Sequence, residues 1–144
     1  MFLPDNAHSG VAVPTVSQMF IKIIVADEEA MADYYMKVYG LKVVHRVEGL
    51  SGGTGERFRE VILSLDGTYS TQTFVLFNFV DREPPRDQQS LVGWVSGDLQ
   101  ALCQRIEANG GKLVGAMKDM PEHGVKVQFS EDPEGALCEN VEML

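Results

Sequence analysis

Short alternating runs of apolar and polar residues follow one another along this chain, and they predict strands interrupted by two helices. In the first half, strands are expected over residues 19–25, 41–48, 58–65 and 73–79. In the second half, strands are expected over residues 91–96, 112–117 and 125–130, and a last strand follows Gly135. The run 73–79 is very apolar, which is typical of a strand buried on both faces.

The two helices are predicted from their ends. Asp27 and Asp98 are favourable N-cap residues, and Gly40 and the Asn109-Gly110-Gly111 run are typical helix stops. Within each predicted helix the apolar residues recur at helical spacing, which indicates one buried stripe. In the first helix this stripe is Met31, Tyr34, Tyr35 and Val38, and in the second it is Leu99, Leu102 and Ile106.

The pattern repeats. The two helix starts lie 71 positions apart, as do the two glycines Gly40 and Gly111. Each half reads strand, helix, strand, strand, strand, so we expect an α+β fold of two tandem βαβββ modules that form a curved mixed sheet around a cleft, with helices on the outer face. The expected modules are residues 18–80 and 90–144 of a single domain, with a linker at 81–89 and an N-terminal arm at 1–17.

Composition narrows the possible partners. The net charge of −9 argues against nucleic acid, and no apolar run is long enough to span a membrane, so a cytoplasmic protein is expected. The two cysteines, Cys103 and Cys138, lie on a predicted helix and strand and are expected to be free buried thiols.

Two loops carry information. Residues 49–55 are rich in glycine and predict a mobile loop that could act as a lid. A phosphate cradle is not favoured there, because a strand follows instead of a helix. Near the C-terminus, Asp132-Pro133-Glu134-Gly135 predicts a tight turn, after which Glu139 shares one strand face with Leu137, Val141 and Met143.

Three segments of the chain resemble the vicinal oxygen chelate superfamily, which includes glyoxalases, bleomycin-resistance proteins and extradiol dioxygenases. The segments are Val25-Ala26-Asp27 with Tyr34-Tyr35 and Val38-Tyr39-Gly40-Leu41, then Ile106 to Lys112, then Asp132-Pro133-Glu134-Gly135 with Glu139. The resemblance covers residues 18–144. It implies a small-molecule site between the modules and a homodimer.

In metal-using relatives, four side chains hold a divalent ion. The resemblance puts these positions on Phe20, at or next to Leu76, on Leu91 and on Glu139. Only Glu139 can donate a lone pair, so neither a metal nor another cofactor is expected. His45 or His123 joining Glu139 is the alternative for a metal.

The expected cavity has an apolar wall and a few polar groups. Lys22 and Glu139 are expected to pair across strands or to flank a substrate, and Trp94 is expected to face away from the cavity, toward a helix. The full set of expected ligand-binding residues is Phe20, Lys22, Leu76, Asn78, Leu91, Gly93, Gln128 and Glu139.

Three functions are consistent with this sequence. The favoured one is metal-free binding of a small, largely apolar or aromatic molecule, as in bleomycin-resistance proteins. The second is a lyase, isomerase or dioxygenase of the same superfamily, with Glu139 as the catalytic general base or as a metal ligand. The third is a regulatory module that has kept the fold without the chemistry.

Overall fold

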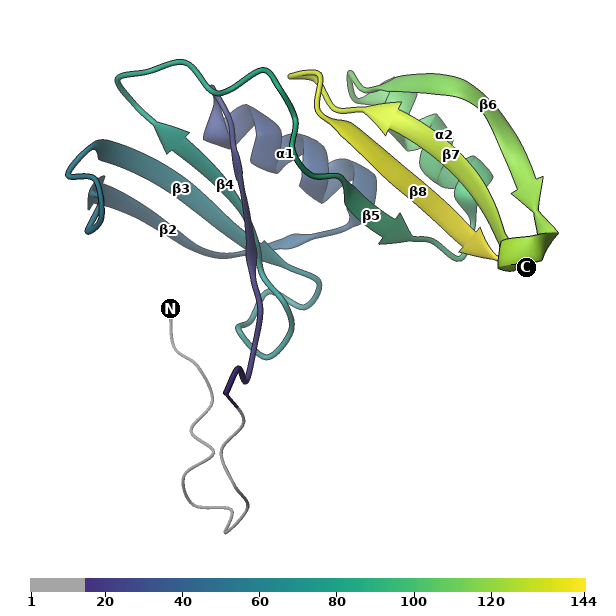
Figure 1. The fold of residues 1–144 in the computed structure, drawn as a ribbon, viewed down its shortest axis with the longest axis horizontal. Coiled ribbons are helices and arrows are strands. Elements are labelled where there is room, and N and C mark those ends of the chain that lie inside the picture. The colour runs from purple at the N-terminus through teal and green to yellow at the C-terminus, as the bar shows by residue number, and fades with distance from the viewer. Residues whose placement is uncertain (1–14) are drawn as a thin grey trace, which may run out of the picture. The chain divides into compact units, whose positions relative to one another are not determined.

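A computed structural model describes residues 15–144 of the chain as an α+β protein. Figure 1 shows its eight strands, two α-helices and one short 3₁₀ helix. The strands of the first half are β1 (Ile21–Ile24), β2 (Lys42–Leu50), β3 (Arg57–Ser64) and β4 (Phe74–Phe79), and α1 is Glu28–Tyr39. The second half contains β5 (Val92–Val95), α2 (Leu99–Ala108), β6 (Lys112–Met120), η1 (Pro121–His123), β7 (Val125–Glu131) and β8 (Leu137–Met143).

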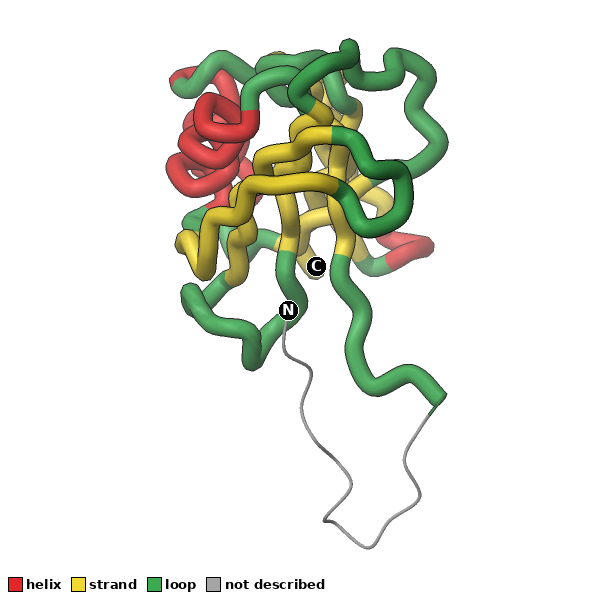
Figure 2. Tube along the Cα trace, turned by 90° about the vertical axis from the view of Figure 1, so that its left-hand side faces the viewer, coloured by secondary structure: helices red, strands yellow, loops and turns green. Residues whose placement is uncertain are grey.

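The strands form two sheets of four with the same topology (Figures 1 and 2). Sheet A has the order β1-β4-β3-β2 and sheet B the order β5-β8-β7-β6. In each sheet the first strand pairs in parallel with the last, and the other neighbours are antiparallel. β1 begins at Ile21 and β5 at Val92, 71 positions later, so the predicted repeat of two βαβββ modules is confirmed.

Both helices start where their caps predict. The Asp27 carboxylate accepts a hydrogen bond from the Ala30 N–H, and Asp98 accepts one from Ala101 in the same way. The predicted inner stripes are buried in both helices. The N-cap hydrogen bonds and the burial of one face of each helix therefore both stabilise α1 and α2.

The chain divides into two compact units, and the division does not follow the repeat. Among the described residues, unit 1 comprises 15–32 and 41–83, and unit 2 comprises 33–40 and 84–144. The boundary passes through α1, so the first turn of this helix belongs to unit 1 and its remaining turns belong to unit 2. The linker predicted at 81–89 contains the second boundary.

Within unit 2, an aromatic cluster joins α1 to sheet B. Trp94 of β5 stacks on Tyr39 with a centroid separation of 4.3 Å, and the Tyr39 hydroxyl donates a 2.7 Å hydrogen bond to Asn140 of β8. Asn140 is fully buried and also donates to Ser130. Trp94 thus faces a helix, as its place in the alternation predicts.

The turn between β7 and β8 has the predicted form. The Gly135 N–H donates to the Asp132 carbonyl, and Gly135 has a φ of +91°, a left-handed value that favours glycine. The Asp132 carboxylate accepts from the N–H groups of Glu134 and Ala136. The conspicuous acidic turn is therefore stabilised by its own aspartate.

Two predictions about loops and strand ends were wrong. The glycine-rich loop begins later than predicted, because Gly49 and Leu50 still pair with β3. The Ser51 hydroxyl then accepts from Gly53 and Thr54, which gives a short hydrogen-bonded turn. β6 extends three residues beyond its predicted end, to Met120, across a shift of register between Val114 and Lys118.

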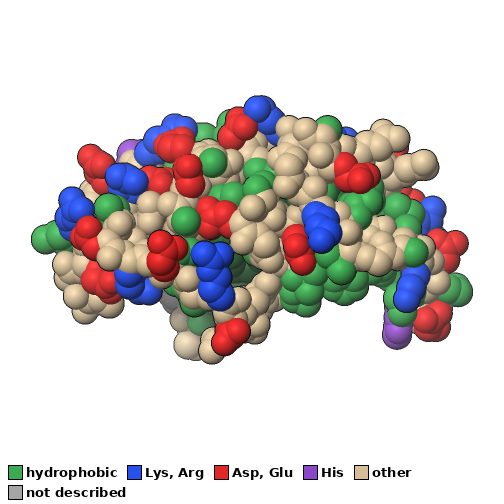
Figure 3. Space-filling model, turned by 90° about the horizontal axis from the view of Figure 1, so that it is seen from above, with side chains coloured by type: hydrophobic (Ala, Val, Ile, Leu, Met, Phe, Trp, Pro, Cys, Tyr) green, Lys and Arg blue, Asp and Glu red, His purple; other side chains and the backbone are tan. Residues whose placement is uncertain are grey.

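Cys103 and Cys138 are free and buried, as expected. Burial raises the pKa of the Cys138 thiol to about 11. Figure 3 shows acidic and basic side chains interspersed on the face seen from above, with apolar side chains between them. Within residues 15–144, no helix is long and apolar enough to cross a membrane. His8 and most of the predicted arm lie outside the described residues.

Candidate functional site

One face of sheet A carries a cluster of phenylalanines, which we call the phenylalanine face. Its rings come from β3 and β4: Phe58 stacks on Phe77 with centroids 5.0 Å apart, and Phe79 meets Phe77 edge to face at 4.7 Å. Phe77 is 9% exposed, whereas Phe58 and Phe79 are only half-buried. The antiparallel register, which pairs Phe58 with Phe79, brings these rings together.

Lys22 of β1 brings a positive charge to this face. Its ammonium lies 4.9 Å from the centroid of Phe77 and 5.9 Å from that of Phe20. Both distances are in the range of a cation–π contact. Phe20, just before β1, is 42% exposed, so the lysine and its aromatic neighbours border solvent.

The carboxylate that pairs with Lys22 is Glu60 of β3, not the expected Glu139. The Lys22 Nζ atom lies 2.7 Å from Glu60 Oε2, and the Glu60 side chain is 7% exposed against 35% for Lys22. A nearly buried carboxylate therefore holds a half-exposed ammonium in place on an aromatic surface. Such a pair is expensive to break, because one partner would be left as an uncompensated buried charge.

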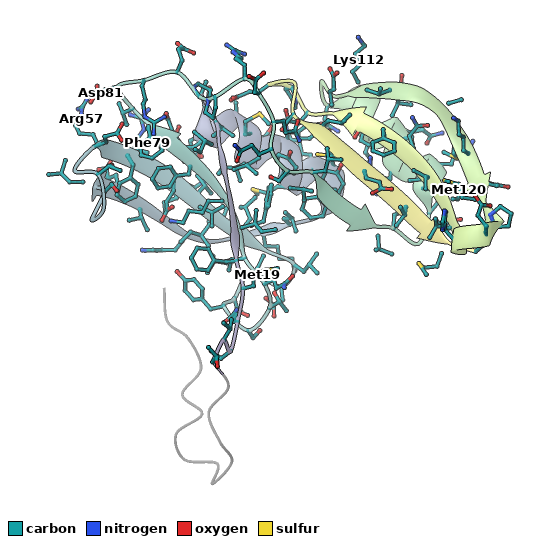
Figure 4. All side chains as sticks on the ribbon, viewed as in Figure 1. Met19, Arg57, Phe79, Asp81, Lys112 and Met120 are labelled. Carbon is teal, nitrogen blue, oxygen red and sulfur yellow. The ribbon has the colours of Figure 1, made fainter. Side chains whose placement is uncertain are left out.

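Charged pairs close the far end of the phenylalanine face. The Arg82 guanidinium lies 3.8 Å from the Phe79 centroid and donates to Glu56, while Arg57 makes two hydrogen bonds to Asp81. Figure 4 shows Arg57, Asp81 and Phe79 gathered where β3 begins and β4 ends. The Arg57 guanidinium lowers the pKa of Asp81, mainly through its hydrogen bonds.

Leu76 and Asn78, expected beside Phe20 and Lys22, lie on the opposite face of sheet A. Asn78 donates to the Glu28 carboxylate in the first turn of α1, and Arg59 donates to the same carboxylate. Alternation along β4 puts Val75 and Phe77, not Leu76, on the side of Lys22. The prediction that Leu76 and Asn78 share one face with Lys22 is therefore wrong.

In sheet B, Glu139 of β8 lies between Gly93 of β5 and Phe129 of β7 on one face. A Cβ added at Gly93 would meet only the Glu139 carbonyl oxygen, at 4.0 Å, so this glycine leaves room beside the carboxylate. Leu91, two residues before Gly93, is 51% exposed. The structure thus brings Glu139, Gly93 and Leu91 to neighbouring positions, as the alternation predicts.

Gln128 does not belong to this group. It is 3% exposed and lies on the opposite face of β7, in register with Asn140. Its amide nitrogen donates to the carbonyls of Val114 and Gly115, where β6 bulges, and of Phe129. The expected placement of Gln128 beside Glu139 is wrong, because its amide instead satisfies the backbone at the bulge.

The residues do not fit a divalent metal ion. Of the positions that the resemblance assigns to ligands, Phe20, Leu91 and either Leu76 or its neighbours Val75 and Phe77 carry no lone pair. Within residues 15–144, no group of three or more His, Cys, Asp and Glu side chains is arranged to hold a metal. Glu139 alone does not supply the three or more protein ligands that such sites use.

Sequence reasoning missed Glu60 and Phe58. The signal was present, because Glu60 is an acid within the predicted strand 58–65, most of whose residues are apolar, and a buried acid requires a partner. Alternation also places Phe58 and Glu60 on one face.

Known proteins resemble this chain in sequence. A model of the Glyoxalase/Bleomycin resistance protein/Dioxygenase superfamily matches residues 17–139. Among characterised proteins, the lactoylglutathione lyase of Neisseria meningitidis serogroup A is 23% identical over 125 residues, which cover 82% of this chain and 84% of that enzyme.

Solved structures share the fold. A glyoxalase family protein from Bacillus cereus superposes with a TM-score of 0.76 at 17% identity, covering 93% of this chain and 99% of that one. Glyoxalase I from Zea mays superposes with a TM-score of 0.71 at 18% identity, covering 88% of this chain. The match covers 47% of the maize chain, so this protein spans about half of that enzyme's length.

Proposed function

Because this chain belongs to the Glyoxalase/Bleomycin resistance protein/Dioxygenase superfamily, we propose that it binds a small, largely aromatic molecule on the phenylalanine face of sheet A, without a metal ion. The observation that carries this proposal is the cluster of Phe58, Phe77 and Phe79, two of which are half-buried rings at a surface. Small-molecule sites are lined mainly by apolar and aromatic side chains with a few polar groups.

The phenylalanine face supplies what an aromatic guest requires. Ring–ring contacts in offset or edge-to-face geometry contribute about 0.5–1.5 kcal/mol each beyond the burial of area. The three rings are already packed against one another, so little side-chain entropy is lost when a further ring is added. Their backbone lies in paired strands, which keeps this surface preformed.

The proposal that no metal ion takes part rests on the side chains at the four positions assigned to metal ligands. Glu139 is the one assigned position that carries a ligand atom, and its neighbours on sheet B are Gly93 and Phe129. Binding to the phenylalanine face requires no ion. The reaction of a metal-dependent relative is therefore not needed to account for this surface.

Equilibrium binding of 2-ethylnaphthalene, followed by the probe's fluorescence, tests the proposal. The Phe58→Leu variant should bind it several-fold more weakly, because it loses the ring that stacks on Phe77 while keeping an apolar side chain. The matched control is Phe129→Leu, which removes a ring from sheet B instead. Circular dichroism checks that both variants are folded.

Two results would contradict the proposal. The first is the absence of saturable binding by the wild-type protein. The second is binding that Phe129→Leu weakens and Phe58→Leu does not, which would move the site to sheet B.

An enzyme of the superfamily is the second candidate, and the carboxylate of Glu139 beside the space over Gly93 favours it. A positioned carboxylate contributes roughly 10²–10⁴-fold as a general base. The test is formation or breakdown of lactoylglutathione, the compound in the name of the meningococcal relative, by protein of known metal content. Turnover that Glu139→Gln lowers by about 10² or more would favour catalysis over simple binding.

A further inference from the structure

Lys22 is the one cation that lies over the rings Phe20 and Phe77 among the contacts of residues 15–144. From its surroundings we infer that the ligand of the phenylalanine face is a neutral aromatic ketone, whose carbonyl oxygen accepts a hydrogen bond from the Lys22 ammonium. This inference rests on the proposed function, and it adds the chemical group that the site selects.

The donor is available. An ammonium has three N–H groups, and the hydrogen bond to Glu60 uses one of them. The Lys22 side chain is 35% exposed, so its remaining N–H groups are open to solvent and to a ligand. An acceptor that replaces water there gains a charge-assisted hydrogen bond.

The position of the donor fits an aromatic guest. The Lys22 ammonium lies 4.9 Å from the Phe77 centroid, and Phe58 stacks on the same Phe77 ring. A planar ring packed against the phenylalanines would therefore bring a substituent at its edge close to the ammonium. An aryl ketone keeps its carbonyl in the plane of the ring, which suits this arrangement.

Glu60 determines which charge on the ligand's acceptor group the site favours. This carboxylate is 6% exposed and already neutralises Lys22, so the pair has no net charge. A ligand carboxylate would place a second anion near the buried one, in a protein of net charge −9. Like charges at short range repel strongly where water is scarce. A neutral carbonyl accepts the same hydrogen bond without this repulsion.

The test compares three naphthalenes of similar size: 2-acetylnaphthalene, which carries the ketone, 2-ethylnaphthalene, which lacks the acceptor, and 2-naphthoate, which carries a negative charge. We expect the ketone to bind about tenfold or more tightly than either of the other two, as for a hydrogen bond to a charged donor. Isothermal titration calorimetry at fixed salt measures all three.

Variants of Lys22 test whether this residue causes the preference for the ketone. In Lys22→Met, the ketone should bind no better than 2-ethylnaphthalene. Since this variant leaves Glu60 buried without its partner, the double variant Lys22→Met/Glu60→Leu, which removes both charges, provides a second measurement. Lys22→Arg keeps N–H donors and should keep the preference. Lys37→Met, on the exposed surface of α1, is the matched control.

Each outcome decides the matter. A ketone preference that both Met variants abolish supports the inference. Equal binding of ketone and ethyl compound by the wild type overturns it and leaves the proposed function standing, as does tightest binding of 2-naphthoate. If none of the three compounds binds, the proposed function fails, and this inference fails with it.

Discussion

The Tyr35 hydroxyl, in α1, donates a 2.7 Å hydrogen bond to the carboxylate of Asp132, which begins the turn before β8 and lies 97 positions further along the chain. Both side chains are buried, with 0% and 4% of their surfaces exposed. Within unit 2, this bond joins a helix from the first repeat to the acidic turn of the second repeat. The two strongest sequence signatures of this chain are thus direct partners.

Loss of this hydrogen bond should lower stability. Tyr35→Phe leaves one oxygen of the buried Asp132 carboxylate without its donor, and we expect the free energy of unfolding to fall by about 1–3 kcal/mol. Urea denaturation measures the change. Tyr34→Phe, on the preceding residue, is the control, because no hydrogen bond involves the Tyr34 hydroxyl within residues 15–144. Equal losses in the two variants would refute the assignment.

Stability should also depend on pH through Asp132. Burial raises the pKa of this carboxyl above its ordinary value, against the opposing hydrogen bonds from Tyr35, Ala136 and Glu134. The folded state then holds the proton more tightly than the unfolded state does. The resulting stabilisation is fully present below the unfolded pKa of about 3.9 and is lost as the pH rises through the folded pKa.

We therefore expect the free energy of unfolding of the wild type, relative to Asp132→Asn, to decrease as the pH rises from about 4 through the folded pKa. The asparagine does not titrate, so the difference between the two proteins isolates this group. Urea denaturation at a series of pH values measures it. A difference that increases with pH would show that the hydrogen bonds outweigh burial.

Gly111 lies where no side chain fits. A Cβ there would lie 2.6 Å from the Tyr34 hydroxyl, 2.7 Å from Ile106 Cγ2 and 3.1 Å from the Glu131 carbonyl. Gly111→Ala should therefore destabilise the protein by about 1–3 kcal/mol through overpacking. Gly97→Ala is the control, since a Cβ at Gly97 meets nothing within 4 Å, and thermal denaturation of the two variants should separate them clearly.

Two adjacent glutamates in α1 should differ in their effect on stability. Glu28 is 6% exposed and accepts hydrogen bonds from Arg59 and from the buried Asn78 amide. Glu28→Gln replaces one acceptor oxygen with a donor and should lower the free energy of unfolding by about 1–3 kcal/mol. Glu29 pairs with Arg46 at the surface, so Glu29→Gln should change it by less than about 1 kcal/mol.

High salt should change the stability effects of these two variants differently. The Glu29–Arg46 pair is exposed, and its small contribution should disappear at about 1 M salt, where charges are screened within about 3 Å. The effect of Glu28→Gln should persist, because it arises from buried hydrogen bonds. A Glu28 effect that vanished with salt would show that its partners act only through charge.

The sequence predicted the elements that depend on local signals. Asp27 and Asp98 cap their helices through their own side chains, and Gly135 takes a left-handed φ that few other residues adopt. The 71-residue spacing then predicted the tandem modules, and the resemblance of three motif segments predicted the family. The capping and turn signals each lie within a few residues of the structure that they specify.

The faces of β4 could not be predicted in this way. Residues 74–77 are all apolar, so no alternation shows which of Leu76 and Phe77 faces Lys22. Pairing with β1 and β3 decides it, and that pairing is set by residues far along the chain. The contacts of Gln128 depend in turn on a bulge in β6, a neighbouring strand, which the alternation of β7 does not reveal.

The division of α1 between the two compact units affects how the chain can be cut. A fragment that ends at residue 83 keeps the whole helix but separates Tyr35 and Tyr39 from Asp132 and Asn140. The complementary fragment keeps sheet B without the helix residues that complete its compact unit. The core of unit 2 is therefore divided between the two fragments, whereas unit 1 stays within the first, and mixing the two should restore the structure of unit 2. A single break in the chain would leave a second subunit that needs the first to complete its core.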